Sequence, residues 1–413
     1  MKERLPGVDD GSPDQVVCHV DMDCFYAACE RLREPELRGE PLVVGMGYES
    51  GETHGAVATA SYEAREFGVE SAMPITEALE LLPREAEASE SGPEQTGFYR
   101  PVDLDFYESV AADVKEILRT TADTVREVSI DEAYLDVTDA VDWDEAEAFG
   151  DHLKTRIEEE VGVVASVGIA PTMSAAKIAS DHDKPDGLTV VESGTVREFL
   201  APLDVAAVHN VGPVTARELR EMSIETAGDL AAADPEPLVE RFGERGRTIW
   251  DFARGEDDRA VEPVGEPKSF SRESAFTEAT DDPERKRDRV RALASDVAER
   301  ATRRNALYQT IGIKVVTPPF SIQTRAESLP GPVEDSDLVE EIALDLLSEF
   351  ADDDVRKLGV RVSNLSFSTA DQATLDGFED GPTRTDRSLS EFADGGDTDD
   401  ATVTGQTSLG DFE

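Results

Sequence analysis

The chain has 413 residues and a formal net charge of −51, with 91 Asp and Glu against 40 Lys and Arg. Because 39% of the residues are hydrophobic, it can form about two to four domains with cores, which excludes an intrinsically disordered acidic protein. Only 9 residues are lysine, and this acidic, lysine-poor composition indicates a halophilic protein, since molar salt shortens the Debye length to about 3 Å and screens self-repulsion.

The cysteines and the apolar segments exclude further classes of protein. Cys18, Cys24 and Cys29 lie within twelve residues of each other, and no second cluster or suitably spaced His set accompanies them. This pattern supports neither a zinc site nor a disulfide framework. The first residues lack an apolar signal segment, and no run approaches the roughly 18 apolar residues of a membrane span. We therefore expect a cytoplasmic protein without membrane association.

The first predicted strand ends at a carboxylate. In "VVCHVDMDCFYAACERL" (16–32), an apolar strand leads to Asp21, and apolar residues at helical spacing follow from Phe25. A carboxylate at a strand-to-helix transition, followed by free N–H groups, suits a metal ion together with a polyphosphate. At its spacing, Asp23 is expected to point away from Asp21 and to be structural.

A second apolar segment, "EVSIDEAYLDVTD" (127–139), holds two adjacent carboxylates, Asp131 and Glu132. Apolar and β-branched residues alternate around the pair, which predicts a buried strand. Because an unpaired buried carboxylate is costly, the pair predicts a cation site that Asp21 completes. Three carboxylates could hold two Mg²⁺ ions, which would activate a 3′-hydroxyl and stabilise a leaving pyrophosphate.

Three further segments are "GAVATASYEAREFGVESAMPITEA" (55–78), "SVGIAPTMSAAKIASDHDKPDG" (166–187) and "VHNVGPVTARELREMSIETAGDL" (208–230). Together with "HVDMDCFYAACE" and "SIDEAYLDVTD", they resemble the Y-family, lesion-bypass DNA polymerases, in particular the DNA polymerase IV branch. The resemblance covers roughly residues 10–370. It implies an α+β multidomain fold of the right-hand type: a palm with a mixed sheet and helices, fingers, a helical thumb and an α/β little finger.

The resemblance also implies roles for individual residues. It implies that the metal ligands are Asp21, the Met22 carbonyl, Asp131 and Glu132. It implies that the incoming nucleotide is bound by Phe25, Tyr26, Thr59, Tyr62, Arg65 and Lys184. Tyr26 matches the steric gate, an aromatic ring under the sugar that rejects a ribose 2′-hydroxyl. A spacing of three residues from Thr59 to Arg65 predicts one helical face directed at phosphate.

The predicted helical thumb contains a motif for DNA. "VHNVGPVTARELREMSI" resembles a helix-hairpin-helix, in which backbone N–H groups after Val211 and Gly212 hold a DNA phosphate. His209-Asn210 replaces the Pro-Gly that is common in that hairpin. An ordinary turn between two helices is the alternative.

Residues 268–368 match the little finger, which grips DNA outside the active site. They carry 15 Lys and Arg against 19 Asp and Glu, so they contribute only −4 of the chain's −51. The least acidic region is thus the one that the resemblance assigns to DNA. The segment 285–305 gathers arginines on one predicted helix, and we expect DNA contacts from Arg303 and Arg304. A solvated helix face is the alternative.

The segment from 369 onward is rich in Gly, Asp and Thr and is predicted to be disordered. It holds two similar octamers, "QATLDGFE" (372–379) and "QTSLGDFE" (406–413), which resemble the clamp-interacting peptide. The second copy is expected to dock on a sliding clamp, and the first is expected to be a weaker contact. The clamp contacts expected in the second copy are Gln406, Leu409 and Phe412.

The predicted domains are palm (1–24 and 93–190), fingers (25–92), thumb (191–256), linker (257–267), little finger (268–368) and acidic tail (369–413). We predict a monomeric, template-directed DNA polymerase of the translesion type that uses two Mg²⁺ ions, dNTPs and primed template DNA. It would have low processivity and no proofreading exonuclease. The alternatives are an inactive scaffold that binds DNA and clamp, against which the complete carboxylate set argues, and a palm-fold nucleotide cyclase, against which the thumb and Tyr26 argue.

Overall fold

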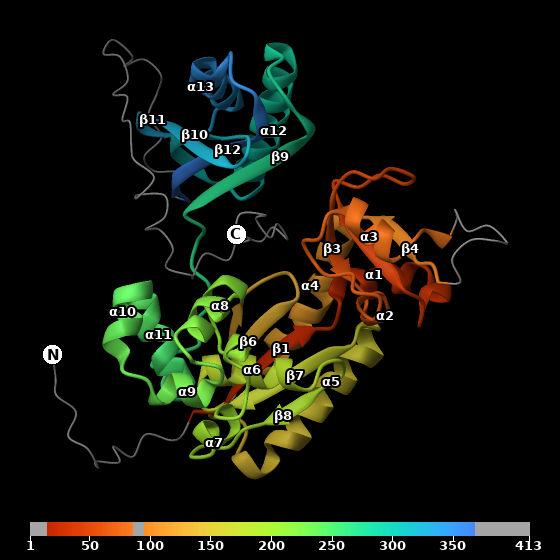
Figure 1. Cartoon of the computed structure of the whole chain (residues 1–413), viewed down its shortest axis with the longest axis vertical. Helices are drawn as coiled ribbons and strands as arrows, with labels where there is room; N and C mark the ends of the chain where they lie inside the picture. The colour runs from red at the N-terminus through yellow and green to blue at the C-terminus, as the bar shows by residue number, and fades with distance from the viewer. Residues whose placement is uncertain (1–14, 86–94, 368–413) are drawn as a thin grey trace. The chain divides into compact units, whose positions relative to one another are not determined.

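The computed structural model describes residues 15–85 and 95–367 (Figure 1). Its contacts divide the chain into two compact units, and the boundary lies between Val264 and Gly265. Each unit forms its own hydrophobic core around a β-sheet.

The first unit is organised around a five-stranded sheet in the order β5-β6-β1-β7-β8. Its strands are β1 (Val17–Met22), β5 (Thr124–Glu127), β6 (Glu132–Asp136), β7 (Ala165–Ala170) and β8 (Leu188–Val190). β1 runs antiparallel to both β6 and β7, and β8 runs parallel to β7. Every residue of β1 is buried, which is why this strand takes the centre of the sheet.

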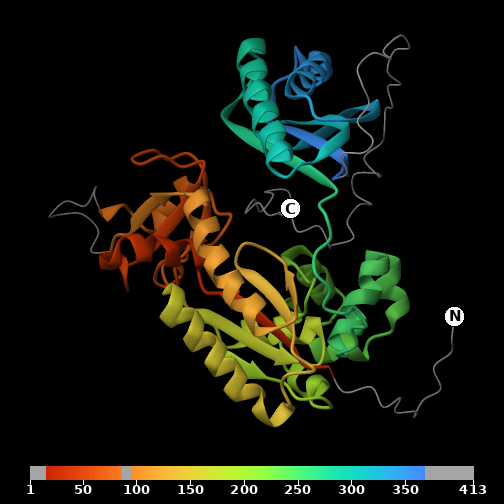
Figure 2. The same ribbon diagram turned by 180° about the vertical axis from the view of Figure 1, so that it is seen from behind.

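Helices cover both faces of this sheet. They are α1 (Phe25–Arg33), α4 (Leu104–Thr121), η3 (Trp143–Glu145), α5 (Ala146–Val161) and α6 (Met173–His182). α4 and α5 pack on one face and α6 packs on the other. Figure 2, which views the molecule from behind, has α4 and α5 toward the viewer. Because side chains alternate along a strand, Cys18 and Val20 enter the core under α4 and α5, whereas His19 and Asp21 meet residues of α6.

A second, smaller sheet belongs to the same unit and has the order β3-β2-β4. The elements of this region are η1 (Pro35–Leu37), β2 (Leu42–Met46), β3 (Ala56–Ala60), α2 (Tyr62–Arg65), α3 (Ile75–Leu81) and β4 (Phe98–Pro101). β2 pairs antiparallel with β3 and parallel with β4. This smaller sheet has its own hydrophobic core, which contains Val43, Val57, Ile75, Leu82 and Tyr99.

Short helices complete the first unit. They are α7 (Val196–Leu200), η4 (Val205–Ala207), α8 (Pro213–Glu221), α9 (Ala227–Ala232), α10 (Pro235–Phe242) and α11 (Glu244–Ala253). The chain after α11, which the sequence predicts to be a linker, starts as packed structure. The Asp257 side chain is only 1% exposed; it accepts a 2.9 Å hydrogen bond from the Ser174 N–H at the start of α6 and pairs with Arg259. Asp257 is therefore a buried structural acid at the start of the predicted linker.

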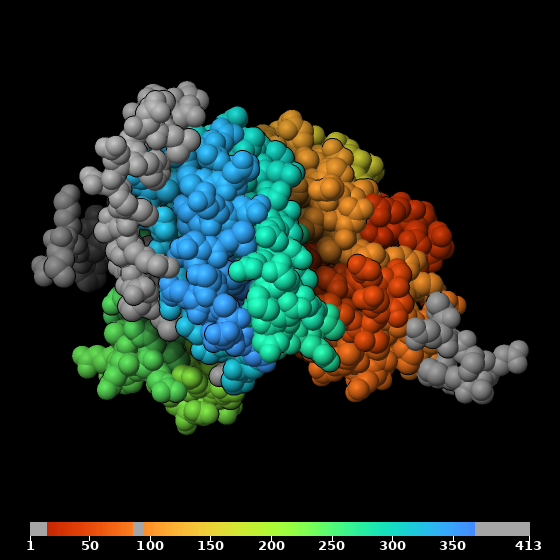
Figure 3. Space-filling view, turned by 90° about the horizontal axis from the view of Figure 1, so that it is seen from above, coloured from red at the N-terminus to blue at the C-terminus, as the bar shows by residue number. Residues whose placement is uncertain are grey.

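The second unit is a four-stranded antiparallel sheet in the order β11-β10-β12-β9. Its elements are β9 (Ser269–Thr280), α12 (Pro283–Arg303), β10 (Leu307–Thr317), β11 (Ser321–Val333), α13 (Ser336–Leu347), η5 (Ser348–Phe350) and β12 (Val355–Ser366). α12 and α13 lie side by side over one face of the sheet, and Figure 3 shows their outer surface. Neither helix covers the opposite face.

None of the helices in the described parts of either unit combines the length and the apolar character that a membrane crossing needs.

Candidate active site

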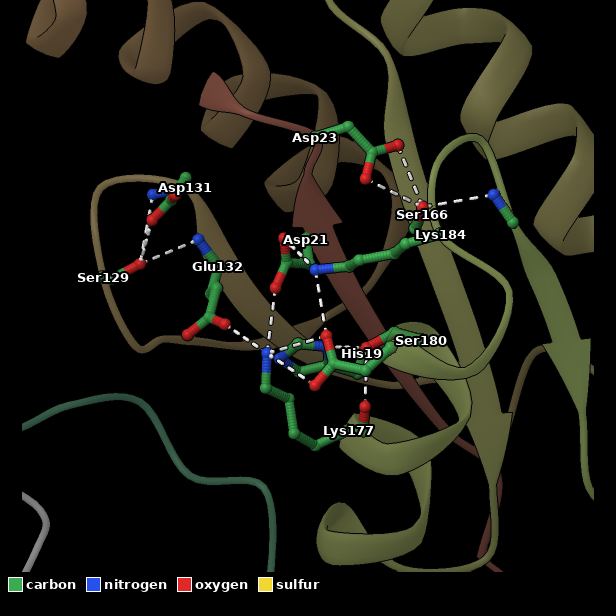
Figure 4. Close-up of polar contacts among 12 residues, drawn as sticks. His19, Asp21, Asp23, Ser129, Asp131, Glu132, Ser166, Lys177, Ser180 and Lys184 are labelled. Carbon is green, nitrogen blue, oxygen red and sulfur yellow. Dashed lines mark hydrogen bonds and ion pairs between the residues drawn. The ribbon is translucent and has the colours of Figure 1, made fainter. Parts of the chain in front are cut away.

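Two carboxylates meet at the centre of the five-stranded sheet. Asp21, near the end of β1, lies directly opposite Glu132, the first residue of β6. Opposite residues on one face of an antiparallel pair have their Cβ atoms about 4.5–5.5 Å apart, so the two acids are neighbours. Both are directed to the side of the sheet that α6 covers (Figure 4).

Lys177 on α6 and Lys184 just beyond it neutralise this pair. The Lys177 Nζ atom lies 2.9 Å from Asp21 Oδ2 and also contacts Glu132 Oε1. The Lys184 Nζ atom lies 2.6 Å from Asp21 Oδ1 and 2.9 Å from Asp181 Oδ1. Asp181 follows Lys177 by four residues and precedes Lys184 by three, and its carboxylate contacts both ammonium groups.

Burial and charge move the pKa values of these groups apart. Burial alone would raise the pKa of the Asp21 carboxyl, but the Lys177 ammonium, a hydrogen bond with Glu132 and the Lys184 ammonium together hold it well below its usual value. Burial raises the pKa of Glu132 to about 7, and Lys177 only partly offsets this effect. The pKa of Asp21 is thus lowered and that of Glu132 raised, because the lysines outweigh burial at Asp21 and burial outweighs the lysine at Glu132.

Asp131 lies in a turn, which corrects the prediction of one strand through 127–139. β5 ends at Glu127 and β6 begins at Glu132, so the acidic pair spans the end of the turn and the start of the strand. The cause is Ser129, whose Oγ accepts hydrogen bonds from the N–H groups of Asp131 (3.2 Å) and Glu132 (3.0 Å). Ser129 also donates to Asp131 Oδ1 at 2.5 Å, so this carboxylate is turned away from Asp21 and Glu132.

The predicted set of three carboxylates is therefore a close pair with the third directed elsewhere. Within residues 15–85 and 95–367, no three Asp, Glu, His or Cys side chains are gathered as ligands around one point. The donor chemistry nevertheless fits a hard cation, because carboxylate oxygens of Asp21 and Glu132 converge on the Lys177 ammonium, which occupies the position of a positive ion. Met22 adjoins them and donates its N–H to the Asp131 carbonyl at 3.0 Å.

Tyr26 lies in α1 beside this cluster. Its side chain is buried and stacks on Tyr107, with ring centroids 4.7 Å apart. The Phe25 ring is also buried, and its centroid lies 6.1 Å from that of Tyr26. Burial, followed by the nearby charge of Asp131, raises the pKa of Tyr26 to about 12, so the ring stays neutral. The Tyr26 ring is thus held rigidly by its packing.

The structure separates Thr59 from Tyr62 and Arg65, which corrects the prediction of one helical face. Thr59 belongs to β3, and α2 begins only at Tyr62, because Ser61 caps the helix by accepting a hydrogen bond from the Ala64 N–H. The Arg65 guanidinium lies 4.8 Å from the centroid of the Tyr62 ring, and its Nε donates to the Ala60 carbonyl at 3.0 Å. The two α2 residues thus form one local cationic and aromatic group.

Several residues hold the site together through contacts that the sequence does not predict. The sequence alone assigns no role to Lys177, although its spacing from Asp181 and Lys184 is a signal that could have identified it. Asp23, expected to be structural, does point away from Asp21, and it binds residues of three other segments. Ser129 has no signal in the sequence pattern, since a serine in an apolar segment is commonplace.

The predicted DNA contacts belong to other elements of the chain. The Val211 side chain is buried, and Gly212 is the residue before α8, whose first position is Pro213. Arg303 is the last residue of α12, and Arg304 follows it; both are exposed. The clamp residues Gln406, Leu409 and Phe412 lie outside the described residues.

Sequence comparisons identify the family. The model of the impB/mucB/samB family matches residues 20–181, and the model of its C-terminal domain matches residues 267–376. A DNA polymerase IV of Halobacterium salinarum is 62% identical over 376 residues, which are 91% of each chain. The chain belongs to the Y family of DNA polymerases.

Solved structures agree with this assignment. The protein resembles a Y-family DNA polymerase chimera with a TM-score of 0.75 at 28% identity, over 86% of this chain and all of that one. It resembles an insertion ternary complex of Dbh DNA polymerase with a TM-score of 0.60 at 28% identity and the same coverage. The predicted Y-family membership and the right-hand α+β fold are therefore confirmed, and the Halobacterium relative fits the interpretation of the acidic surface as a halophilic one.

Proposed function

We propose that this Y-family polymerase is a template-directed DNA polymerase of the translesion type, which adds dNTPs to a primer without proofreading. The observation that carries the proposal is the Asp21–Glu132 pair at the centre of the sheet, held by Lys177 and Lys184. A catalytically inactive scaffold would have no need for mutually repelling buried acids. The relatives named DNA polymerase IV support the same conclusion.

Divalent metal would be held by Asp21 and Glu132, joined by Asp131 and the Met22 carbonyl, and we propose two Mg²⁺ ions. Bound Mg²⁺ would supply Lewis-acid activation of the primer 3′-hydroxyl and charge stabilisation of the leaving pyrophosphate. The lysines that pair with these acids supply positive charge at the site. When metal ions replace them, their ammonium groups would be free to bind phosphate oxygens.

The incoming dNTP would be bound by the chain's own groups. Lys184 and the Tyr62–Arg65 pair would bind the triphosphate, together with Thr59 on β3. Tyr26, fixed against Tyr107, would exclude a ribose 2′-hydroxyl, and Phe25 would support it from behind. A cyclase would act on a nucleotide alone, and neither the gate nor the DNA-binding unit described below would serve it.

The open face of the sheet in the second unit supports DNA binding. Within 269–275, 310–316, 322–328 and 357–363, the positions on this face include one carboxylate, Glu273. The others include small and hydroxyl side chains and the cations Lys314, Lys357 and Arg361. Such a basic, hydroxyl-rich surface is complementary to a phosphate backbone, which is unexpected in a chain of net charge −51.

Further contacts are proposed from the sequence. The N–H groups that follow Val211 and Gly212, and the side chains of Arg303 and Arg304, would add contacts to the DNA backbone. Gln406, Leu409 and Phe412 would dock on a sliding clamp. Deletion of 405–413 should greatly reduce stimulation by the clamp and leave basal extension by the monomeric polymerase unchanged.

The decisive experiment is primer extension in molar KCl with Mg²⁺ and dNTPs, on intact and abasic templates. The wild type is compared with Asp131→Asn/Glu132→Gln and with Glu158→Gln/Glu159→Gln, an exposed acidic pair on α5. We expect extension by the wild type and the α5 variant only, with synthesis past the abasic site. DNA binding without extension by any of the three would favour the scaffold, and conversion of a nucleotide without template would favour the cyclase.

A further inference from the structure

Asp23 is a buried carboxylate that the proposed metal chemistry does not use. Its side chain is 6% exposed and lies on the opposite side of β1's end from Asp21 (Figure 4). The Ser166 hydroxyl donates to both of its oxygens, at 3.0 and 2.9 Å, and the Asp186 N–H donates to Oδ2 at 2.8 Å. The Tyr62 hydroxyl donates to Oδ1 at 3.1 Å. With both oxygens occupied by protein donors, Asp23 has no free position for a metal ion.

The three donors come from separate parts of the chain. Ser166 is in β7, next to the central strand β1, and is fully buried, so it gives Asp23 a rigid support. Tyr62 opens α2, beside the small sheet, and its ring carries the Arg65 guanidinium. Asp186 is in the turn between α6 and β8, two residues after Lys184. Asp23, at the end of β1, is therefore hydrogen-bonded both to Tyr62 and to the turn that carries Lys184, the two groups proposed to bind the triphosphate.

The turn at Lys184 is held at its backbone while its ammonium group can exchange partners. The Gly187 N–H donates to Ser166 Oγ at 3.1 Å, and the Asp186 carboxylate pairs with Lys154 of α5 at 3.0 Å. Among the described residues, the Lys184 Nζ atom pairs with the carboxylates of Asp21 and Asp181. Entry of metal and triphosphate would draw this ammonium from the carboxylates to phosphate, and the hydrogen bonds of Asp23 and Ser166 would keep the backbone in place meanwhile.

We propose that Asp23 is a positioning residue for the incoming nucleotide: it fixes Tyr62 of α2 and the Lys184 turn in one mutual arrangement that matches a triphosphate. The inference rests on the proposed polymerase function. It assigns to Asp23 an effect on dNTP binding and leaves the chemical step to Asp21, Asp131 and Glu132. A residue that merely stabilised the fold would lower the melting temperature without moving the dNTP affinity.

The test uses the full-length protein in molar KCl with Asp23→Ala and Asp23→Asn. In single-nucleotide insertion we expect Asp23→Ala to raise the KM for dNTP about tenfold with kcat changed less than about threefold, because it removes charge-assisted hydrogen bonds to Tyr62 and Asp186. Asp23→Asn keeps one acceptor oxygen and should raise KM by about threefold. Equilibrium binding of dNTP to a complex with a dideoxy-terminated primer should weaken by the same factors.

Two further variants separate positioning from stability. Ile157→Val removes one methyl group from the core of the same unit and should lower the melting temperature with KM unchanged. Tyr62→Phe should raise KM in the wild-type background but add little to Asp23→Ala, because both changes break the same link.

An unchanged KM and dNTP affinity in both Asp23 variants, or strictly additive effects with Tyr62→Phe, would overturn the inference. If Asp23→Ala does not fold, Asp23→Asn decides the question alone. Failure of the wild type to extend a primer would instead contradict the proposed function, and the two outcomes are distinguished in the same assay.

Discussion

The two units balance charge in opposite ways at the surfaces proposed to bind ligands. In the large sheet, Lys177 and Lys184 neutralise the buried acids Asp21 and Glu132. In the sheet of the second unit, one acid neutralises two lysines: Glu273 Oε1 lies 3.0 Å from Lys314 Nζ, and Oε2 lies 2.5 Å from Lys357 Nζ. In the first region lysines balance carboxylates that are proposed to bind metal, and in the second a carboxylate balances lysines that are proposed to bind phosphate.

The geometry of Glu273 explains how it reaches both lysines. Glu273 on β9 pairs with Gly359 on β12, and Gly359 pairs in turn with Lys314 on β10, so the three form one row across the sheet. A Cβ at position 359 would meet Glu273 Cγ at 2.8 Å. The absence of a side chain at Gly359 thus lets the glutamate lie across β12, within reach of the next strand.

The largest expected effect follows the removal of one carboxylate from the large sheet. Asp21→Asn removes a proposed metal ligand, and we expect insertion by the Mg²⁺-loaded enzyme to fall by at least about 1,000-fold, since a bound metal stabilises the developing charge by several kcal/mol. Single-turnover insertion measures this change. Asp151→Asn, an exposed acid on α5, is the matched control and should retain full activity. Comparable rates for the two variants would remove Asp21 from the metal site.

His209 tests whether protonation of a buried residue destabilises the first unit. Burial, and next the charge of Arg259, lowers the pKa of His209 to about 4. An unfolded His titrates near 6.5, so between pH 6.5 and 4 the unfolded state binds more protons, and stability falls as pH falls through this window. We expect a loss of about 2–3 kcal/mol, which His209→Gln should largely abolish in denaturant titrations at several pH values. Identical pH profiles for the two proteins would refute the depressed pKa.

Removal of the acid in the second unit should strengthen DNA binding. Glu273→Gln frees Lys314 and Lys357, and we expect about tenfold tighter binding of primed duplex and a salt dependence steeper by about one to two phosphate contacts. Fluorescence anisotropy across a series of KCl concentrations measures both quantities. Glu341→Gln makes the same change of charge on α13, which covers the opposite face, and should have no such effect. An equal gain from both variants would indicate net charge alone.

The smallest expected effect comes from a change in packing beside Glu273 that leaves the charge of the second unit unchanged. Gly359→Ala would push Glu273 aside without changing any charge, so we expect DNA affinity to rise by about threefold, toward that of Glu273→Gln. Weaker binding would mean that the added methyl distorts β12 more than it displaces the glutamate, which circular dichroism and thermal unfolding would reveal.

The family resemblance predicts the fold, and the apolar pattern predicts part of the site. Alternation predicts one strand that ends at Asp21 and another that holds Glu132, and the structure pairs these two residues on neighbouring strands. The same alternation wrongly extends β6 through Asp131, because a single hydroxyl, that of Ser129, ends the ladder. Equal spacing of Thr59, Tyr62 and Arg65 suggests a helix, but Ser61 starts the helix after Thr59.

The rest of the site depends on contacts between residues that are far apart in the sequence. Asp23 and Ser166 are 143 residues apart in the chain, and Lys177 and Asp21 are 156 apart, so no local pattern can pair them. Spacing can propose that Lys177, Asp181 and Lys184 share one side of α6. Only the packing of α6 on β1 determines which acids they meet.

The scarcity of lysine has a consequence for chemical labelling. The few lysines of the described residues are mostly engaged, and the partners are carboxylates or, for Lys286, three backbone carbonyls at 2.7–3.0 Å. An amine-selective reagent would therefore produce a short list of adducts. DNA would protect Lys314 and Lys357 from it, and a nucleotide would protect Lys184. Each modified peptide would report the occupancy of one surface, a resolution that a protein covered with free lysines does not offer.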